Sequence, residues 1–232
     1  MISIIIPTYN ESKNIQELVE RIKKCLLIPY EIIIVDDGSP DGTGLLAEKL
    51  AIEHPIKVIH RPNKLGLASA VIEGFRVATG DLIGVMDSDL SHPPEIIPNL
   101  LFELENQNAD IAVGSRFAPG GAIENWPKKR LISTNIAMMT VRLLTSIKDP
   151  MSGFFILKKD VIHNVPLIPR GFKILLEILV KGRYQRAIEY PIIFKDRVYG
   201  ASKLSSKVYW EFAAQLLDLY SYKFKSILKS SS

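Results

Sequence analysis

The sequence of 232 residues has a single cysteine, two tryptophans and no long apolar run. Because Cys25 has no second cysteine to pair with, an intramolecular disulfide is excluded, which is compatible with a reducing compartment. No run reaches the roughly 18 apolar residues of a membrane-spanning helix. The first seven residues have no basic lead, which a signal peptide needs. We therefore expect neither a disulfide framework, a signal peptide nor a membrane span in this sequence.

The sequence also has almost no excess of positive or negative charge. The formal net charge is only +4. Residues 195–232 hold seven Lys or Arg against three Asp or Glu, so the rest of the chain is neutral. Nucleic-acid binding usually needs a basic array with interleaved aromatic side chains, and none is present, so we expect no nucleic-acid partner. The hydrophobic content of 47% is that of a globular protein with one good core.

What the sequence does contain is a regular alternation of short apolar runs and helical patterns. Buried strands are expected at residues 2–6, 31–35 and 82–86, and further strands at 57–60, 110–114, from about 155 through Leu157, and at 188–194. Helices are expected at residues 12–26, 43–52, 63–78, 95–106, 131–147 and 171–181. Such β–α alternation with short connections predicts an α/β fold, a mostly parallel, doubly wound sheet in a single domain. We place this domain at residues 1–202 and a C-terminal helix and tail at residues 203–232.

Two carboxylates, Asp87 and Asp89, follow the apolar run of residues 82–86. Carboxylates at the carboxyl end of a buried strand lie where open α/β sheets bind their ligands. Two such oxygen ligands suit Mg²⁺ or Mn²⁺ shared with a diphosphate. The plainer alternatives are a solvated turn or a helix cap.

A second acidic segment, Asp36 to Asp41, follows the strand expected at residues 31–35. Its spacing nearly matches a calcium-binding loop. The preceding strand and Pro40 contradict that reading. We expect these acids instead to hydrogen-bond a base or a ribose beside Asp87 and Asp89.

Short motifs spread along the chain carry a family resemblance. A first set resembles the family 2 glycosyltransferases of the GT-A fold: Pro7-Thr8-Tyr9-Asn10-Glu11, Val35-Asp36-Asp37-Gly38-Ser39, Asp87-Ser88-Asp89, Gly114-Ser115-Arg116 and Ser152-Gly153-Phe154. A second set is similar to the polyprenyl-phosphate (dolichol-phosphate) mannose synthases within that family: Asp89-Leu90-Ser91-His92-Pro93-Pro94-Glu95, Glu124-Asn125-Trp126-Pro127, Gly171-Phe172-Lys173 and Arg197 with Ser202-Lys203. The resemblance covers residues 1 to about 210. It implies an inverting transfer of mannose from GDP-mannose to dolichyl phosphate, giving dolichyl phosphate β-D-mannose and GDP.

The resemblance also implies roles for individual residues. The guanosine would be held by Pro7, Tyr9, Glu11, Val35 and Asp37. The metal, Mg²⁺ or Mn²⁺, and the diphosphate would be held by Asp87, Ser88 and Asp89. The phosphates or the acceptor would be met by Arg116, Arg197 and Lys203, which with Asp89 form the expected catalytic set. Ser91 departs from the pattern, because close relatives carry a glutamine ligand there. Ser91 would be a weak metal ligand, unless water or His92 fills the place; for His92 we expect a structural role.

The chemistry agrees with these assignments. Displacing a nucleoside diphosphate requires that the charge on the leaving group be neutralised. A phosphate monoester has a second pKa of about 6, so the acceptor is mostly dianionic at pH 7 and needs cations rather than a base. The basic loop from Arg197 to Lys203 meets that need. One in-line displacement would invert the anomeric centre.

The C-terminal helix expected at residues 207–229 is amphipathic. Its apolar face holds Val208, Phe212, Leu216, Leu219, Tyr220, Phe224, Ile227 and Leu228, and its polar face holds Glu211, Gln215, Asp218, Tyr222, Lys225 and Lys229. Such a helix can lie in a lipid headgroup layer, which predicts a peripheral protein on the cytoplasmic face of a membrane. The alternative is that this face packs on the domain or on a small membrane subunit.

Three other functions compete with this one. The same reaction with glucose or N-acetylglucosamine from UDP is not excluded by any residue. A non-catalytic sugar-nucleotide-binding protein would not need Asp87, Asp89, Arg197 and Lys203 together. A nucleotidyltransferase usually needs a triphosphate loop rich in Gly, Lys and Arg, and residues 8–14 are not one.

Overall fold

A seven-stranded sheet forms the centre of the protein in a computed structural model, which describes residues 1–124, 126, 128–169, 173–195 and 206–230. The strand order is β3-β2-β1-β4-β7-β5-β8, and β7 alone runs antiparallel to its neighbours. The strands are β1 Ile2–Thr8, β2 Tyr30–Asp36, β3 Ile56–His60, β4 Leu82–Val85, β5 Ile111–Ser115, β7 Phe155–Lys158 and β8 Ala187–Pro191. This confirms the expected α/β class with a mostly parallel sheet.

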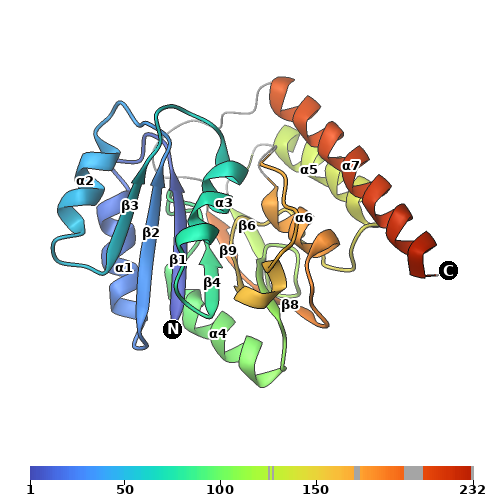
Figure 1. Cartoon of the computed structure of the whole chain (residues 1–232), viewed down its shortest axis with the longest axis horizontal. Coiled ribbons are helices and arrows are strands. Elements are labelled where there is room, and N and C mark those ends of the chain that lie inside the picture. The colour runs from blue at the N-terminus through green and yellow to red at the C-terminus, as the bar shows by residue number, and fades with distance from the viewer. Residues whose placement is uncertain (125, 127, 170–172, 196–205, 231–232) are drawn as a thin grey trace.

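Helices cover both faces of the sheet (Figure 1). One face packs on α1 (Ile15–Cys25), α2 (Thr43–Leu50) and α4 (Ile97–Asn106). The other packs on α3 (Leu67–Val77) and α6 (Ile174–Lys181). Successive strand side chains point to opposite faces, so Ile4 joins the first layer and Ile5 the second. Because both faces are buried, β1 is an almost continuous apolar run.

The expected last strand at residues 188–194 is wrong in one respect, because it is split between two sheets. β8 ends at Pro191, and β9 (Ile193–Lys195) pairs with β6 (Ala122–Glu124) in a separate two-stranded sheet. At the junction, the amide of Ile192 donates a hydrogen bond to Ser115 O at 3.0 Å, and the carbonyl of Ile192 accepts one from the amide of Ala122. Pro191 pairs with Ser115, the last residue of β5, and as part of the edge strand β8 it needs no N–H for a further neighbour.

The long helix α7 (Ser206–Ser230) packs on α5 (Lys128–Val141) and α6. Figure 1 shows α7 lying beside α5 with its C-terminal end projecting beyond the body. The contact is apolar, with Leu219 between Val141 and Leu176. α5 begins at Lys128 rather than 131 and ends at Val141 rather than 147, and Thr145 Oγ1 accepts a hydrogen bond from the amide of Ile147 in the irregular segment that follows.

The faces predicted for α7 are only partly right. Phe212, Leu216, Leu219 and Tyr220 pack inward as part of the apolar cluster, but Phe224 and Leu228 are exposed because they lie past the end of the contact with α5 and α6. Gln215, expected on the polar face, is buried. The exposed apolar stripe is instead Trp210, Leu217, Phe224 and Leu228. Among the described residues, no helix is long and apolar enough to cross a membrane. The expected boundary at residue 202 falls outside the described residues.

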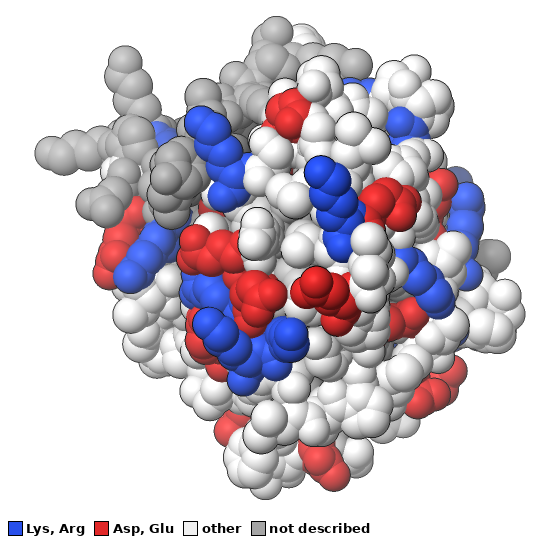
Figure 2. All heavy atoms as spheres, turned by 90° about the vertical axis from the view of Figure 1, so that its left-hand side faces the viewer, with Lys and Arg blue, Asp and Glu red and all other residues white. Residues whose placement is uncertain are grey.

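The edge strand β3 carries charged side chains that keep it from pairing with other chains. Lys57 lies 2.8 Å from Glu31, and His60 lies 2.9 Å from Glu48. Figure 2, which views the side of α2, shows acidic and basic side chains mixed across that face. The mixture leaves no large patch of a single sign on this side of the molecule.

Glu31 holds the start of β2 to two neighbouring segments. One of its oxygens accepts hydrogen bonds from Ser3 Oγ at 2.6 Å and from the amide and hydroxyl of Thr79 at 2.7 Å. Burial alone would raise the pKa of Glu31, but the bonds from Lys57, Ser3 and Thr79 outweigh it and lower that pKa to about 2.

We expect Glu31→Ala to lower the free energy of unfolding by about 2 kcal/mol at pH 7, because buried donors lose their acceptor. A carboxylate with a depressed pKa stabilises the fold above its unfolded pKa of about 4.3, and that stabilisation is lost as pH falls through the folded pKa near 2. Urea unfolding at pH 7 and pH 3 measures both effects. An equal loss at the two pH values would contradict this account.

Candidate active site

The loops that follow β1, β2 and β4 are joined at one edge of the sheet. The amide of Asp37 donates to Thr8 O at 3.0 Å, and Ser88 Oγ donates to Pro7 O at 3.2 Å. Parallel strands place their carboxyl ends together, which explains this convergence. The structure therefore brings the residues expected to hold the nucleoside next to the Asp87–Asp89 turn.

Most of the expected nucleoside residues are already held in place by neighbours. The Lys64 ammonium lies 4.4 Å from the centre of the Tyr9 ring, and the amide of Glu11 donates to Thr43 Oγ1. Val35 is buried within β2. These contacts fix the loop after β1 before any ligand arrives.

Asp37 is a buried carboxylate in an ion pair. Arg61 Nη1 lies 2.8 Å from Asp37 Oδ1, and the amide of Gly66 donates to Asp37 Oδ2 at 2.9 Å. Burial raises the pKa of Asp37, although the Gly66 amide and Arg61 both act to lower it. The Asp37 carboxylate is thus a fixed, poorly solvated hydrogen-bond acceptor at the end of β2. Such an acceptor suits a hydrogen-bond donor on a base or a ribose.

The Asp87–Asp89 turn follows β4 directly. Asp89 is buried and accepts hydrogen bonds from the amide and the hydroxyl of Ser91. The carboxylate of Asp87 lies against Gly153, where an added Cβ would come within 2.8 Å of Oδ2. Only glycine allows the segment before β7 to approach Asp87 so closely.

Ser91 and His92 behave differently from each other. The Ser91 hydroxyl is engaged with Asp89, so its expected part as a weak metal ligand stays a prediction. The buried His92 ring lies between Phe154, at 5.4 Å, and Phe194, at 5.1 Å. Burial lowers the pKa of His92, although Asp87 and Asp89 oppose it. Its Nδ1 accepts the amide of Asp87 at 3.4 Å, which fits the structural role expected of it.

The donor set suits a divalent cation that is shared with a ligand. Among the described residues there is no group of three or more His, Cys, Asp or Glu side chains that could enclose a metal ion. Two strand-end carboxylates fit Mg²⁺ or Mn²⁺, which take one or two carboxylates and fill the remaining positions with phosphate oxygens and water. The residues present therefore fit the expected cofactor.

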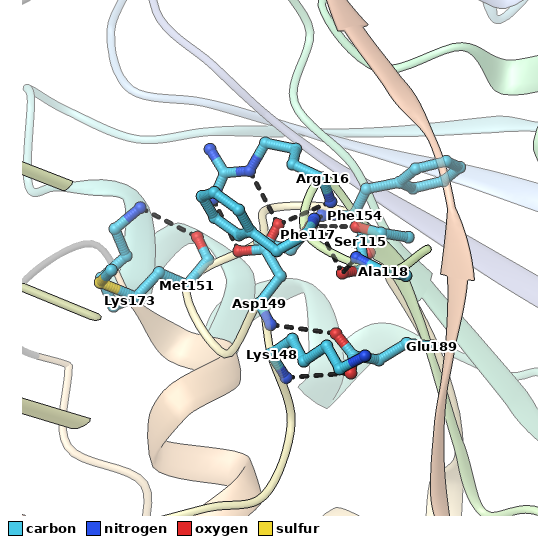
Figure 3. A network of polar contacts seen from close by, with 12 residues as sticks. Ser115, Arg116, Phe117, Ala118, Lys148, Asp149, Met151, Phe154, Lys173 and Glu189 are labelled. Carbon is cyan, nitrogen blue, oxygen red and sulfur yellow. Dashed lines mark hydrogen bonds and ion pairs between the residues drawn. The ribbon is translucent and has the colours of Figure 1, made fainter. Parts of the chain in front are cut away.

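Arg116 and Asp149 form a buried, bidentate ion pair, shown in Figure 3. Arg116 Nε and Nη2 donate to the two carboxylate oxygens at 2.8 and 2.7 Å, and the Arg116 amide donates at 3.0 Å. The amides of Lys148 and Asp149 donate in turn to Glu189. Arg116 was expected to meet phosphates or the acceptor. The structure shows where its guanidinium is anchored, and that role stays a prediction.

Lys173, at the N-terminus of α6, is a candidate that the sequence did not single out as a site residue. Its ammonium donates to Met151 O at 2.9 Å, in the same segment as Asp149 and Gly153 (Figure 3). Burial, and to a smaller extent Arg116, lowers the pKa of Lys173 to about 8, although Asp87 and Asp149 oppose the shift. Lys173 thus lies within electrostatic reach of both the Asp87 carboxylate and the Arg116 pair.

Arg130, on α5, was also missed. Its guanidinium stacks 3.8 Å from the centre of the Trp126 ring, and Arg116 lies 5.4 Å from the same ring. Arg130 also contributes to the lowered pKa of Lys173, so Arg116, Arg130 and Lys173 form a cluster of cations within electrostatic range of one another. The side chains of this cluster come from separate segments of the chain, so no local sequence pattern marks them. Lys173 nevertheless belongs to one of the motifs that carry the family resemblance. Arg197 and Lys203 lie outside the described residues.

Comparison with known proteins agrees with the geometry. The model of the family named Glycosyl transferase family 2 matches residues 3–165. A dolichol-phosphate mannosyltransferase of Pyrococcus furiosus is 47% identical over 96% of this chain, which spans 64% of that relative's length. Proteins of the same name from Saccharomyces cerevisiae and Mycosarcoma maydis are 41% and 39% identical, over 96% and 97% of this chain and 88% and 81% of theirs.

Solved structures show the same fold at low identity. A glucosyl-3-phosphoglycerate synthase from Mycobacterium tuberculosis, crystallised with Mn²⁺, UDP-glucose and phosphoglyceric acid, superposes with a TM-score of 0.70 at 18% identity, covering 94% of this chain and 79% of that one. The fold is therefore that of the GT-A glycosyltransferases. With the family model covering most of the chain and relatives of 39–47% identity along nearly all of it, the protein belongs to glycosyl transferase family 2.

Proposed function

We propose that the protein transfers mannose from GDP-mannose to a polyprenyl phosphate such as dolichyl phosphate, giving the β-linked mannosyl phosphate lipid and GDP. The observation that carries this proposal is the identity of 39–47% to three dolichol-phosphate mannosyltransferases along nearly the whole chain. The strand-end acids and the adjacent cluster of cations support the same chemistry.

The donor binds at the carboxyl ends of β1, β2 and β4. Tyr9 and Asp37 flank the guanosine, with Pro7, Glu11 and Val35 shaping its site. Ser88 lies beside the diphosphate, and Asp87 and Asp89 hold Mg²⁺ or Mn²⁺. A divalent cation at these carboxylates supplies charge neutralisation for the departing diphosphate. The bond between Ser91 and Asp89 orients the carboxylate in advance.

The acceptor is a phosphate monoester and needs no base, because it is mostly dianionic at pH 7. Arg116, Arg130 and Lys173 form one cluster of cations, and Arg197 and Lys203 are proposed to add to them. The bidentate pair with Asp149 holds the Arg116 guanidinium in one orientation, so little reorganisation is required when an anion arrives. Attack on the face opposite the leaving diphosphate inverts the sugar carbon.

The protein attaches to the cytoplasmic face of a membrane through the outer surface of α5 and α7. The two helices are joined where Tyr220 donates to Thr140 O and Lys223 donates to Leu143 O. Their exposed apolar side chains are Ile136, Met139, Leu143, Trp210, Leu217, Phe224 and Leu228. Such a surface can enter a headgroup layer and place the acceptor phosphate near the site. A small membrane subunit is the alternative occupant.

We expect Leu217→Glu and Phe224→Glu each to lower binding to anionic vesicles by about tenfold, because a charge replaces apolar burial. The matched control is Leu27→Glu, which changes a leucine that is even more exposed, on another part of the surface. Co-sedimentation with phosphatidylserine-containing liposomes at low and high salt measures the effect. If all variants sediment equally, this surface is not the anchor. If the wild type does not sediment at all, this surface needs a protein partner or is not the anchor.

A donor panel tests the proposed reaction. The protein is incubated with Mg²⁺, a short polyprenyl phosphate and GDP-mannose, UDP-glucose or UDP-N-acetylglucosamine, and lipid-linked sugar is quantified. We expect product from GDP-mannose at a rate at least about 100-fold above the UDP sugars. Product from a UDP sugar would favour the alternative donor, and binding without turnover would favour a sugar-nucleotide-binding protein.

A further inference from the structure

Gln215 is a buried amide on the inner side of α7, facing the start of α6. Its Nε2 donates to the backbone carbonyl of Lys173 at 3.2 Å. Its Oε1 is buried and accepts no hydrogen bond within the part of the chain that the structure describes. Gln215 shares a small cavity with Glu177, Lys181 and Asp218, and a buried amide that is only half satisfied is costly, so its presence needs an explanation beyond packing.

The residue that Gln215 contacts, Lys173, belongs to the cluster of cations with Arg116 and Arg130. From the same Lys173, the ammonium reaches Met151 O at 2.9 Å (Figure 3). Two residues further on, Gly153 closes against the Asp87 carboxylate. A continuous series of contacts therefore runs from α7 through Lys173 to the segment that packs on Asp87.

We infer that Gln215 is a positioning residue, which couples the seating of α7 to the placement of the Lys173 ammonium and of the 151–153 segment beside Asp87. The inference rests on the proposed mannosyl transfer and deepens it. The helix α7 has an exposed apolar stripe on its outer side, and from its inner side it holds Lys173, a cation of the site. Lys173 is the N-cap residue of α6, where side-chain direction depends on the backbone rather than on a regular helix. Fixing its carbonyl therefore fixes where its side chain begins.

A purely structural role predicts a different outcome from a positioning role. The carbonyl of an N-cap residue already accepts the first bond of its own helix, so it keeps a partner when the Gln215 amide is removed. Gln215→Leu also removes a buried acceptor that has no partner among the described residues. We therefore expect Gln215→Leu to unfold within about 3 °C of the wild type, or above it, while its transfer rate falls.

The test is a double-mutant cycle of Gln215→Leu and Lys173→Met on the full chain, scored by mannosyl transfer to a short polyprenyl phosphate. Gln215→Leu should lower kcat about tenfold and change KM for GDP-mannose less than about twofold. In the Lys173→Met background the same change should have no further effect, because Gln215 acts only through Lys173. Hydrogen exchange of residues 149–158 should be faster in Gln215→Leu than in the wild type, with or without donor.

Leu216→Ala is the control, since it removes packing from the neighbouring position of α7 without touching the hydrogen bond. It should lower Tm and keep kcat within about twofold. The inference is overturned if Gln215→Leu keeps full kcat, if its effect is equal in both backgrounds, or if Leu216→Ala lowers kcat as much. Absence of mannosyl transfer by the wild type would instead refute the proposed function.

Discussion

Asp89→Ala and Asp87→Ala should each lower mannosyl transfer at least about 10³-fold while leaving the protein folded. Both carboxylates follow β4 at the edge of the sheet, and neither supports the apolar core. Chelator should have the same effect on the wild type, and added Mg²⁺ or Mn²⁺ should reverse it. Initial rates with circular dichroism on each variant give the measurement.

Ser91→Ala is the matched control for the two aspartates. It removes the hydroxyl that donates to Asp89 and leaves both carboxylates in place. We expect a loss of about tenfold or less, because both carboxylate ligands remain and only the contact that orients Asp89, or at most a weak ligand, is removed. Full activity of the wild type in chelator, or of Asp89→Ala, would contradict a metal site at this turn.

Breaking the Arg116–Asp149 pair should have the largest effect on stability. Asp149 is fully buried, and Asp149→Ala leaves the Arg116 guanidinium without its partner in a poorly solvated place. Removing one member of a buried pair typically costs about 3–5 kcal/mol of unfolding free energy. Transfer should also fall about 10²-fold or more, because the guanidinium loses its fixed orientation. Urea unfolding and initial rates measure the two effects.

The Arg21–Glu95 pair provides a control with the same bidentate geometry at the surface. Arg21 Nε and Nη2 donate to Glu95 at 2.8 Å, but both side chains are partly exposed. Glu95→Ala should therefore cost no more than about 1 kcal/mol. If the two variants lose similar stability, burial does not set the importance of the Arg116 pair.

The central sheet could be predicted because its signals are local. Runs such as Ile2 to Ile6 and Ile32 to Val35 are β-branched and end in polar loops, which mark buried parallel strands whatever the rest of the chain does. The strand-end position of Asp87 and Asp89 followed from the same pattern. The convergence of these acids with Pro7 and Asp37 then follows from parallel pairing alone.

The missed features depend on contacts between distant segments. Asp149 pairs with Arg116 only because β7 enters the sheet between β4 and β5, and no sequence pattern gives that order. The lysine of the Gly171-Phe172-Lys173 motif could be recognised as a candidate site residue only from its hydrogen bond to Met151 O. Likewise, the buried face of α7 was misassigned at Gln215, because helical periodicity cannot say which side meets α6.

The most direct test of mannosyl transfer is the identity of the product made by the purified full chain. The protein is incubated with ¹³C-labelled GDP-mannose, Mg²⁺ and a short polyprenyl phosphate, and the lipid fraction is analysed by nuclear magnetic resonance. The account predicts mannose linked to the lipid phosphate in the β configuration, with one GDP released for each mannose transferred. A lipid product in the α configuration, or release of free mannose with no lipid-linked sugar, would contradict it.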